Sequence, residues 1–167
     1  MKKLSKETKD KIALITVYAA VIVFCILWLR AEINISRFSK WKSLYAESSL
    51  SQAVSSLEGF QKSGDEKQWE DAALQLREFG ALGMETVVGS EMNPHGLKAD
   101  KYPAPSVETL SDCLVVSAYM LFEPDTVKPY AGELSAALSD ICKNPLGKEG
   151  AERLNEIRAA LDKAANR

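Results

Sequence analysis

Residues 12–29 carry no charged side chain, and this stretch constrains the chain more than any other. A helix over it, at about 1.5 Å of rise per residue, is roughly 27 Å long, close to the hydrocarbon thickness of a bilayer. Lysines precede the stretch, and Trp28 and Arg30 stand at its other end. Aromatic and basic residues in these places anchor a helix at a membrane surface. The stretch therefore predicts a transmembrane anchor.

The same stretch lacks the pattern of a cleaved signal peptide. Such a signal has an apolar part of about 7–15 residues, followed by small residues at the cleavage site. Here the apolar part is longer and runs directly into Trp28, Leu29 and Arg30. Cys25 does not indicate a lipoprotein, because the bulky Phe24 precedes it. We expect the anchor to stay uncleaved.

Positive charge is concentrated before the anchor. All five lysines of residues 1–29 lie within residues 1–11, which form a short basic tail. Lys and Arg are enriched on the cytoplasmic side of a membrane span. We therefore expect a cytoplasmic N-terminus, a single pass through the cell membrane, and an extracytoplasmic domain over residues 30–167.

Residues 30–167 have a helical pattern, without the strict alternation that indicates strands. We expect Gly64 to end a first helix, Asp65 to cap a second with Gln68 as in a capping box, and Ser106 to cap a third. The second helix has the widest apolar face, from Trp69 to Val87. The predicted fold is all-α: a single N-terminal transmembrane helix followed by an antiparallel bundle of about four to five helices.

Residues 90–105 are the one long segment without helical periodicity, and we expect a loop there. It contains the single histidine, His95, between Pro94 and Gly96, in a composition typical of a turn. Tyr102 lies near its end, in a proline-rich stretch that is expected to be extended and exposed. This stretch is either a linker or a docking segment for a partner.

The three cysteines do not form a disulfide framework. Cys25 lies in the predicted anchor, and Cys113 and Cys142 lie in the domain. On consecutive antiparallel helices joined near Asp125, the last two would be separated by more than a disulfide allows. We expect two buried thiols on apolar helix faces.

The sequence has no pattern typical of a catalytic site. A single histidine excludes a three-histidine zinc site and a metalloprotease motif, and no phosphate-binding or nucleophile motif is present. Acidic residues of the second helix lie opposite its apolar face, as on a solvated surface. We predict no catalytic, cofactor-binding or metal-binding residue. The formal charge of residues 30–167 is −5, which disfavours a nucleic-acid partner.

A few residues are candidates for interaction. Small residues at 13, 16 and 20 share one face of the anchor and permit close helix pairing, so a protein partner or homo-oligomer is expected besides membrane lipid. Two aromatic residues at 41 and 45 belong either to the core or to a ligand pocket. The candidates, with the tyrosine of the loop, are Ala13, Thr16, Ala20, Trp41, Tyr45 and Tyr102.

Two functions of different classes fit these features. The first is a non-catalytic, single-pass membrane-anchored helical interaction or scaffold module, as a subunit of a membrane or envelope complex. The alternative is an extracytoplasmic helical bundle that senses a small molecule and acts through a partner. An enzyme is disfavoured, because no constellation of acid, base and nucleophile is visible.

Overall fold

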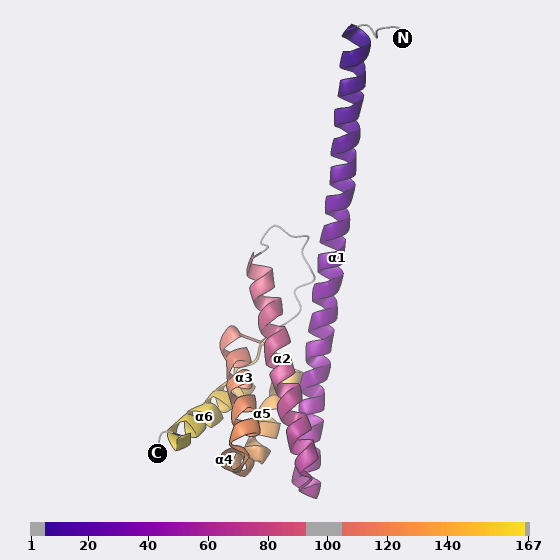
Figure 1. Cartoon of the computed structure of the whole chain (residues 1–167). Helices are drawn as coiled ribbons and strands as arrows, with labels where there is room; N and C mark the ends of the chain where they lie inside the picture. The colour runs from indigo at the N-terminus through magenta and orange to yellow at the C-terminus, as the bar shows by residue number, and fades with distance from the viewer. Residues whose placement is uncertain (1–5, 93–104, 166–167) are drawn as a thin grey trace. The chain divides into compact units, whose positions relative to one another are not determined.

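The computed structural model describes residues 6–92 and 105–165, without the side chains of residues 6–14, 32, 34–41, 43, 86 and 88–92. Every regular element in these ranges is a helix, which confirms the all-α prediction (Figure 1). The elements are α1 (Lys6–Ser63), α2 (Glu66–Met92), α3 (Val107–Phe122), α4 (Pro124–Val127), the 3-10 helix η1 (Lys128–Tyr130), α5 (Ala131–Lys143) and α6 (Lys148–Ala165).

The chain divides into two compact units, residues 1–38 and residues 39–167. The described part of unit 1 is the first part of α1. Unit 2 contains the remainder of α1 and all later helices.

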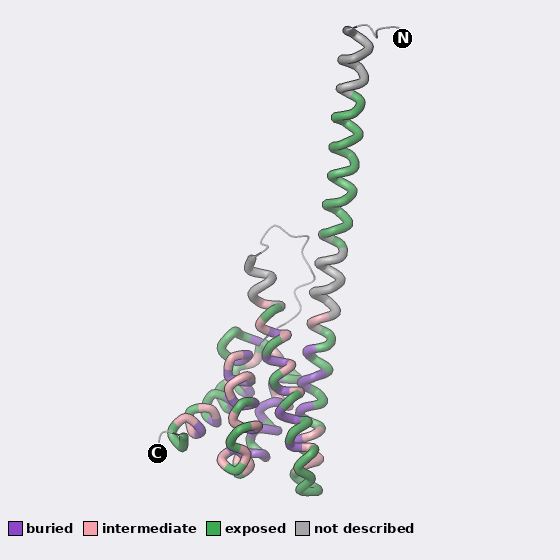
Figure 2. Tube along the Cα trace, in the orientation of Figure 1, coloured by how far each residue is buried: buried purple, intermediate pink, exposed green. Residues whose placement is uncertain are grey.

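In unit 1, large apolar side chains between Ile15 and Leu29 are exposed (green in Figure 2). Within the described residues, no helix contains an apolar stretch that is long enough to cross a membrane. Side chains of the predicted anchor, residues 12–29, are described only from Ile15 on. The part over 15–29 is about 22 Å long, less than the roughly 30 Å of a hydrocarbon core. The structure thus does not show the transmembrane anchor.

Unit 2 has one hydrophobic core, to which α1, α2, α3, α5 and α6 all contribute (purple in Figure 2). This confirms a helical bundle. On α1, the sequence pattern predicts that Leu50, Val54, Leu57 and Phe60 face the core. Leu50 and Leu57 are buried as predicted, Val54 and Phe60 are only partly buried, and Ala46 and Ala53 are buried as well. Leucines fill much of the core. Those completely enclosed are Leu57, Leu76, Leu110, Leu134, Leu138, Leu154 and Leu161.

α1 and α2 form an antiparallel hairpin. Gly64 ends α1 with a φ of 69°, a left-handed conformation that glycine adopts without strain. Asp65 Oδ1 accepts a hydrogen bond of 3.0 Å from the backbone N–H of Lys67. The predicted capping box is replaced by another contact, since Gln68 Oε1 accepts a hydrogen bond of 3.2 Å from the Ser63 hydroxyl.

α2 packs closely against α3. Trp69, Leu76 and Phe79 are buried, as predicted, and Trp69 Nε1 donates a hydrogen bond of 2.9 Å to the carbonyl oxygen of Met120. A Cβ atom at Gly83 would lie 2.5 Å from Leu110 Cδ2, and one at Gly80 would lie 2.8 Å from Leu114 Cγ. The two glycines therefore permit the close approach of α2 and α3. Gly89 in the sequence predicts the end of this helix, but α2 continues to Met92.

α3 begins as predicted, because Ser106 accepts a hydrogen bond from the backbone N–H of Thr109. Its sequence pattern predicts an inward face of Leu110, Cys113, Leu114, Ser117, Ala118, Leu121 and Phe122. Leu110, Cys113 and Ser117 are buried as predicted, but Ala118 and Phe122 are exposed and Asp112 is buried. The observed orientation of α3 places the Asp112 carboxylate against α6, where Asn155 and Arg158 donate hydrogen bonds to it.

The sequence predicts one fourth helix that starts at Asp125 or Thr126 and stops at Asn144 and Pro145, but the structure divides this stretch into α4, η1 and α5. Pro129 has no N–H group to donate within a helix, which is consistent with the change to a 3-10 turn at this point. α5 and α6 form a hairpin. At their crossing, a Cβ atom at Gly150 would lie 2.7 Å from the carbonyl oxygen of Ala137, so the contact requires glycine.

Two leucines of α2 test the placement of this helix. Leu76 is fully buried, whereas Leu74 is 51% exposed. Leu76→Ala is expected to lower the free energy of unfolding by about 2–5 kcal/mol, the usual loss for a buried leucine. Leu74→Ala, the same change on the outer face, is expected to have a much smaller effect. Chemical denaturation of the full chain measures both, and equal losses would contradict the packing of α2.

Candidate functional site

A buried polar cluster joins α3 to α6. Its centre is the Asp112 carboxylate, with the residue only 2% exposed. Arg158 Nη1 lies 2.7 Å from Asp112 Oδ1, and Asn155 Nδ2 donates a hydrogen bond of 3.1 Å to Asp112 Oδ2. Both carboxylate oxygens are thus satisfied, as a buried charge requires.

The cluster continues toward the surface through Asp162. Tyr119 donates a hydrogen bond of 2.9 Å to Asp162 Oδ1, which raises the pKa of the phenol. Arg158 Nε lies 3.6 Å from Asp162 Oδ2. The hydrogen bond to Asp112 raises the pKa of the Arg158 guanidinium, so this cation stays charged. One guanidinium thus lies between two carboxylates, and the cluster holds α3 to α6.

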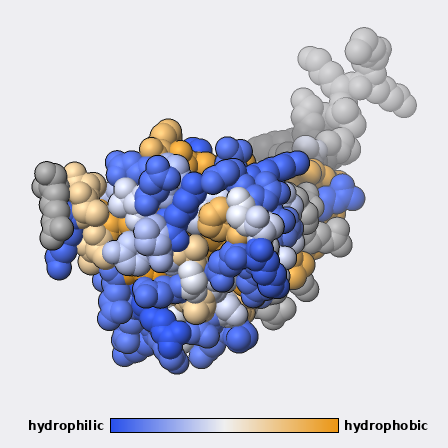
Figure 3. All heavy atoms as spheres, turned by 90° about the horizontal axis from the view of Figure 1, so that it is seen from below, coloured by the Kyte–Doolittle hydropathy of each residue, from blue (hydrophilic) through white to orange (hydrophobic). Residues whose placement is uncertain are grey.

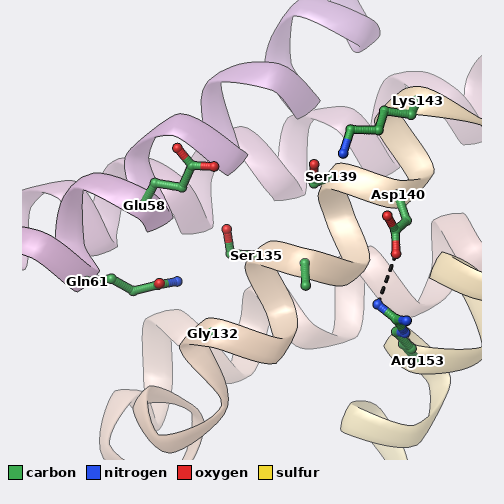
Figure 4. Close-up of a pocket in the computed structure, with 9 residues that line it drawn as sticks. Glu58, Gln61, Gly132, Ser135, Ser139, Asp140, Lys143 and Arg153 are labelled. Atoms are coloured by element: carbon green, nitrogen blue, oxygen red, sulfur yellow. Dashed lines mark hydrogen bonds and ion pairs between the residues drawn. The ribbon is translucent and has the colours of Figure 1, made fainter.

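A second feature is a polar groove on unit 2, with a volume of about 360 Å³ (Figure 4). α5 forms its floor, the end of α1 one wall, and Arg153 of α6 part of the other. Ala136 is the only residue of its lining with an aliphatic side chain. The lining residues are Glu58, Gln61, Gly132, Ser135, Ala136, Ser139, Asp140, Lys143 and Arg153.

Charges in the groove are partly neutralised. Arg153 Nη1 lies 3.0 Å from Asp140 Oδ2, and Arg153 Nη2 lies 2.7 Å from Glu149 Oε1. Glu58 and Lys143 form no ion pair with any residue in the described ranges. One negative and one positive side chain of the groove therefore remain available to an occupant.

The cysteines differ in their surroundings. All three are free thiols, so the prediction that Cys113 and Cys142 are not paired is confirmed. Cys113 is buried as predicted, and burial, with the nearby charge of Asp112, raises the pKa of its thiol. Cys142 is exposed, contrary to the prediction. It follows Ile141, the last buried residue of α5, and its position on the helix points it away from the core.

The sequence-based candidates do not form one site. Thr16, Ala20 and Tyr45 are exposed, so Tyr45 is not a core residue. The side chains of Ala13 and Trp41 lie outside the described residues, as do Tyr102 and His95. No group of three or more His, Cys, Asp or Glu side chains within the described part of the chain could hold a metal ion.

Sequence reasoning missed both polar features of unit 2. Asp112 stands within an apolar helix beside Cys113, and a charge in such a place is a signal for a buried ion pair. The groove had a weaker signal in the small residues Gly132, Ser135, Ala136 and Ser139, which recur on one face of α5. Glu58 and Gln61 of α1, which lie opposite these residues, are distant from them in the sequence and did not indicate a groove.

Comparison of the chain with protein-family models, with curated proteins and with solved structures finds no match.

The Asp112–Arg158 pair can be tested against a surface pair on the same helix. Arg158→Met leaves the buried Asp112 carboxylate without its cation, which is strongly unfavourable. Arg153→Met also removes two ion pairs, but these are solvent-exposed and contribute little. The urea midpoint of the full chain is expected to fall clearly further for Arg158→Met. Equal midpoints would show that the cluster does not hold α3 to α6.

The thiols give a test of burial. A maleimide added to the folded chain in detergent is expected to modify Cys142 and to leave Cys113 unmodified, because a buried thiol with a raised pKa forms little thiolate. Peptide mass spectrometry measures both sites in one sample. After denaturation both should react. Modification of Cys113 at the rate of Cys142 before denaturation would contradict the core of unit 2.

Proposed function

We propose that this protein is a non-catalytic, single-pass membrane-anchored interaction module. Residues 12–29 insert into the cell membrane, residues 1–11 form a cytoplasmic tail, and the bundle of unit 2 is presented outside the membrane to a partner. The observation that carries this proposal is the exposed apolar surface of α1 in unit 1.

That surface covers every side of the helix. Ile15, Tyr18 and Ile22 follow one face, whereas Val17, Phe24 and Trp28 point to others, and all of them are 59% or more exposed. A helix that is apolar all round needs a surrounding apolar medium, either a protein core or a membrane. The described part of unit 1 consists of this helix alone and provides no such core.

A bilayer fits this surface better than a partner helix does. One partner covers a single stripe, and the remaining sides would still expose apolar side chains to water. Lipid chains cover all sides at once. The residues at the two ends of the apolar stretch also favour a bilayer, because Lys9 and Lys11 precede it and Trp28 and Arg30 stand at its other end. The lysine-rich tail favours the cytoplasmic side for the N-terminus.

Unit 2 has the surface of a solvated module. Hydrophilic side chains dominate the face in Figure 3, between smaller hydrophobic areas. Its most exposed large apolar residues, Phe122 and Leu146, lie on different segments. Its buried cysteine and its neutralised Asp112–Arg158 pair do not provide a nucleophile or a base, which supports an interaction role over catalysis.

Insertion can be tested with the full chain and phosphatidylcholine vesicles. We expect the chain to float with the vesicles in a density gradient and to resist alkaline extraction. A double variant, Ile22→Lys with Phe24→Lys, places lysines on two sides of the helix. Each costs about 2.5–3.5 kcal/mol at the centre of a span, so the variant is expected to stay in the soluble fraction.

The matched control places two lysines at exposed apolar positions of unit 2, Phe122→Lys with Leu146→Lys. This control is expected to float as the natural chain does. In the vesicles, a membrane-impermeant maleimide should modify Cys142 and not Cys25, although both are exposed in the structure. Flotation of the Ile22 and Phe24 variant, or equal modification of Cys25, would overturn the anchor.

A further inference from the structure

The groove of unit 2 has properties that the anchor and the core do not explain. The Ser135 residue is 7% exposed, and its hydroxyl lies open to the groove with no hydrogen bond to any of the described residues. Figure 4 shows this hydroxyl turned into the groove, on the side where Glu58 of α1 lies. Because this hydroxyl is open to the groove, its hydrogen bonds remain free for water or for the polar atoms of an occupant that replaces water.

The charges of the groove specify the ends of that occupant. Glu58 lies over the floor near Ser135, and Lys143 lies farther along α5, beyond Ser139 (Figure 4). Of the charged residues that line the groove, these two form no ion pair within the described part of the chain, whereas Asp140 is paired with Arg153. A neutral occupant with a cation at one end and an anion at the other would complement both.

The length of the groove floor on α5 limits the size of the occupant. From Ser135 to Lys143, α5 advances by about 12 Å at 1.5 Å per residue. An extended peptide of three residues spans roughly 10 Å. Between its charged ends, a peptide backbone offers N–H and C=O groups in alternation, which suit hydroxyls that both donate and accept. The walls offer no apolar pocket for a large side chain.

We propose that the groove binds a short zwitterionic peptide with free ends. Its ammonium group lies at Glu58, its carboxylate lies at Lys143, and its backbone forms hydrogen bonds with Ser135 and Ser139. This site rests on the proposed interaction role of unit 2 but not on the membrane anchor. It gives the bundle a ligand class and assigns the end of α1 to recognition.

The test uses the isotope-labelled full chain in detergent micelles and triglycine as the probe. Because the groove is open and polar, we expect millimolar affinity, with saturable shifts of the amide signals of Gly132 and Ser139 at about 10 mM peptide. N-acetyl-triglycine lacks the ammonium group, and triglycinamide lacks the carboxylate. Each is expected to bind about tenfold more weakly, the effect of one lost charged contact.

Variants assign the two ends. The Glu58→Gln variant should bind N-acetyl-triglycine as well as it binds triglycine. The Lys143→Met variant should bind triglycinamide as well as it binds triglycine. Glu156→Gln and Lys163→Met, which remove charges outside the groove on α6, should leave triglycine binding unchanged. All four variants should still float with vesicles, so a failed anchor and a failed groove give different results.

Three outcomes would overturn the proposal. The first is the absence of a saturable shift with triglycine. The second is equal binding of the natural chain to the blocked peptides, which would show that free ends are not recognised. The third is full binding of triglycinamide, which would indicate the N-terminus of a larger protein rather than a short peptide.

Discussion

The packing of α2 between α1 and α3 is the interaction on which the rest of unit 2 depends. Its apolar face carries Trp69, Leu76 and Phe79 into the core, and its outer contacts include the hydrogen bond from Ser49 to Glu78 and the ion pair between Lys42 and Glu85. Gly80 and Gly83 bring α3 close. Once α3 is fixed there, Asp112 faces α6, and α6 in turn holds α5 through Gly150. The groove on α5 is thus the end of a chain of contacts that begins at α2.

The Asp112–Arg158 pair adds specificity to this packing. Removal of two charges from water costs about as much as their attraction returns, so such a pair contributes little net stability, but one partner without the other is costly. Alternative rotations of α6 would leave Asp112 buried without a cation. The pair, with Asn155 beside it, therefore selects the face of α6 that contacts α3, and with it the position of Arg153 at the groove. Apolar packing alone would select this face less strictly.

Unit 1 follows a different physical rule. In unit 2, each helix has one apolar face and one polar face, and the apolar faces cover one another. Between Ile15 and Leu29, α1 is apolar on all sides and has nothing in the described part of unit 1 to cover it. The same helix thus contains a segment adapted to water on one side and a segment that needs an apolar environment all round. This difference in patterning is the basis of the proposed membrane role.

The sequence by itself determined what depends on local periodicity and local backbone chemistry. It predicted the all-α class, the end of α1 at Gly64, the cap at Ser106, the buried face of α2 and the free, buried Cys113, because spacing and capping act within a few residues. Tertiary structure decided what depends on partners distant along the chain. The burial of Asp112, the exposure of Cys142 and Tyr45, and the groove between Glu58 and Ser135 each require residues from a second helix. A helix's own sequence indicates that it has an inner face, but the helices packed against it fix the exact rotation of that face.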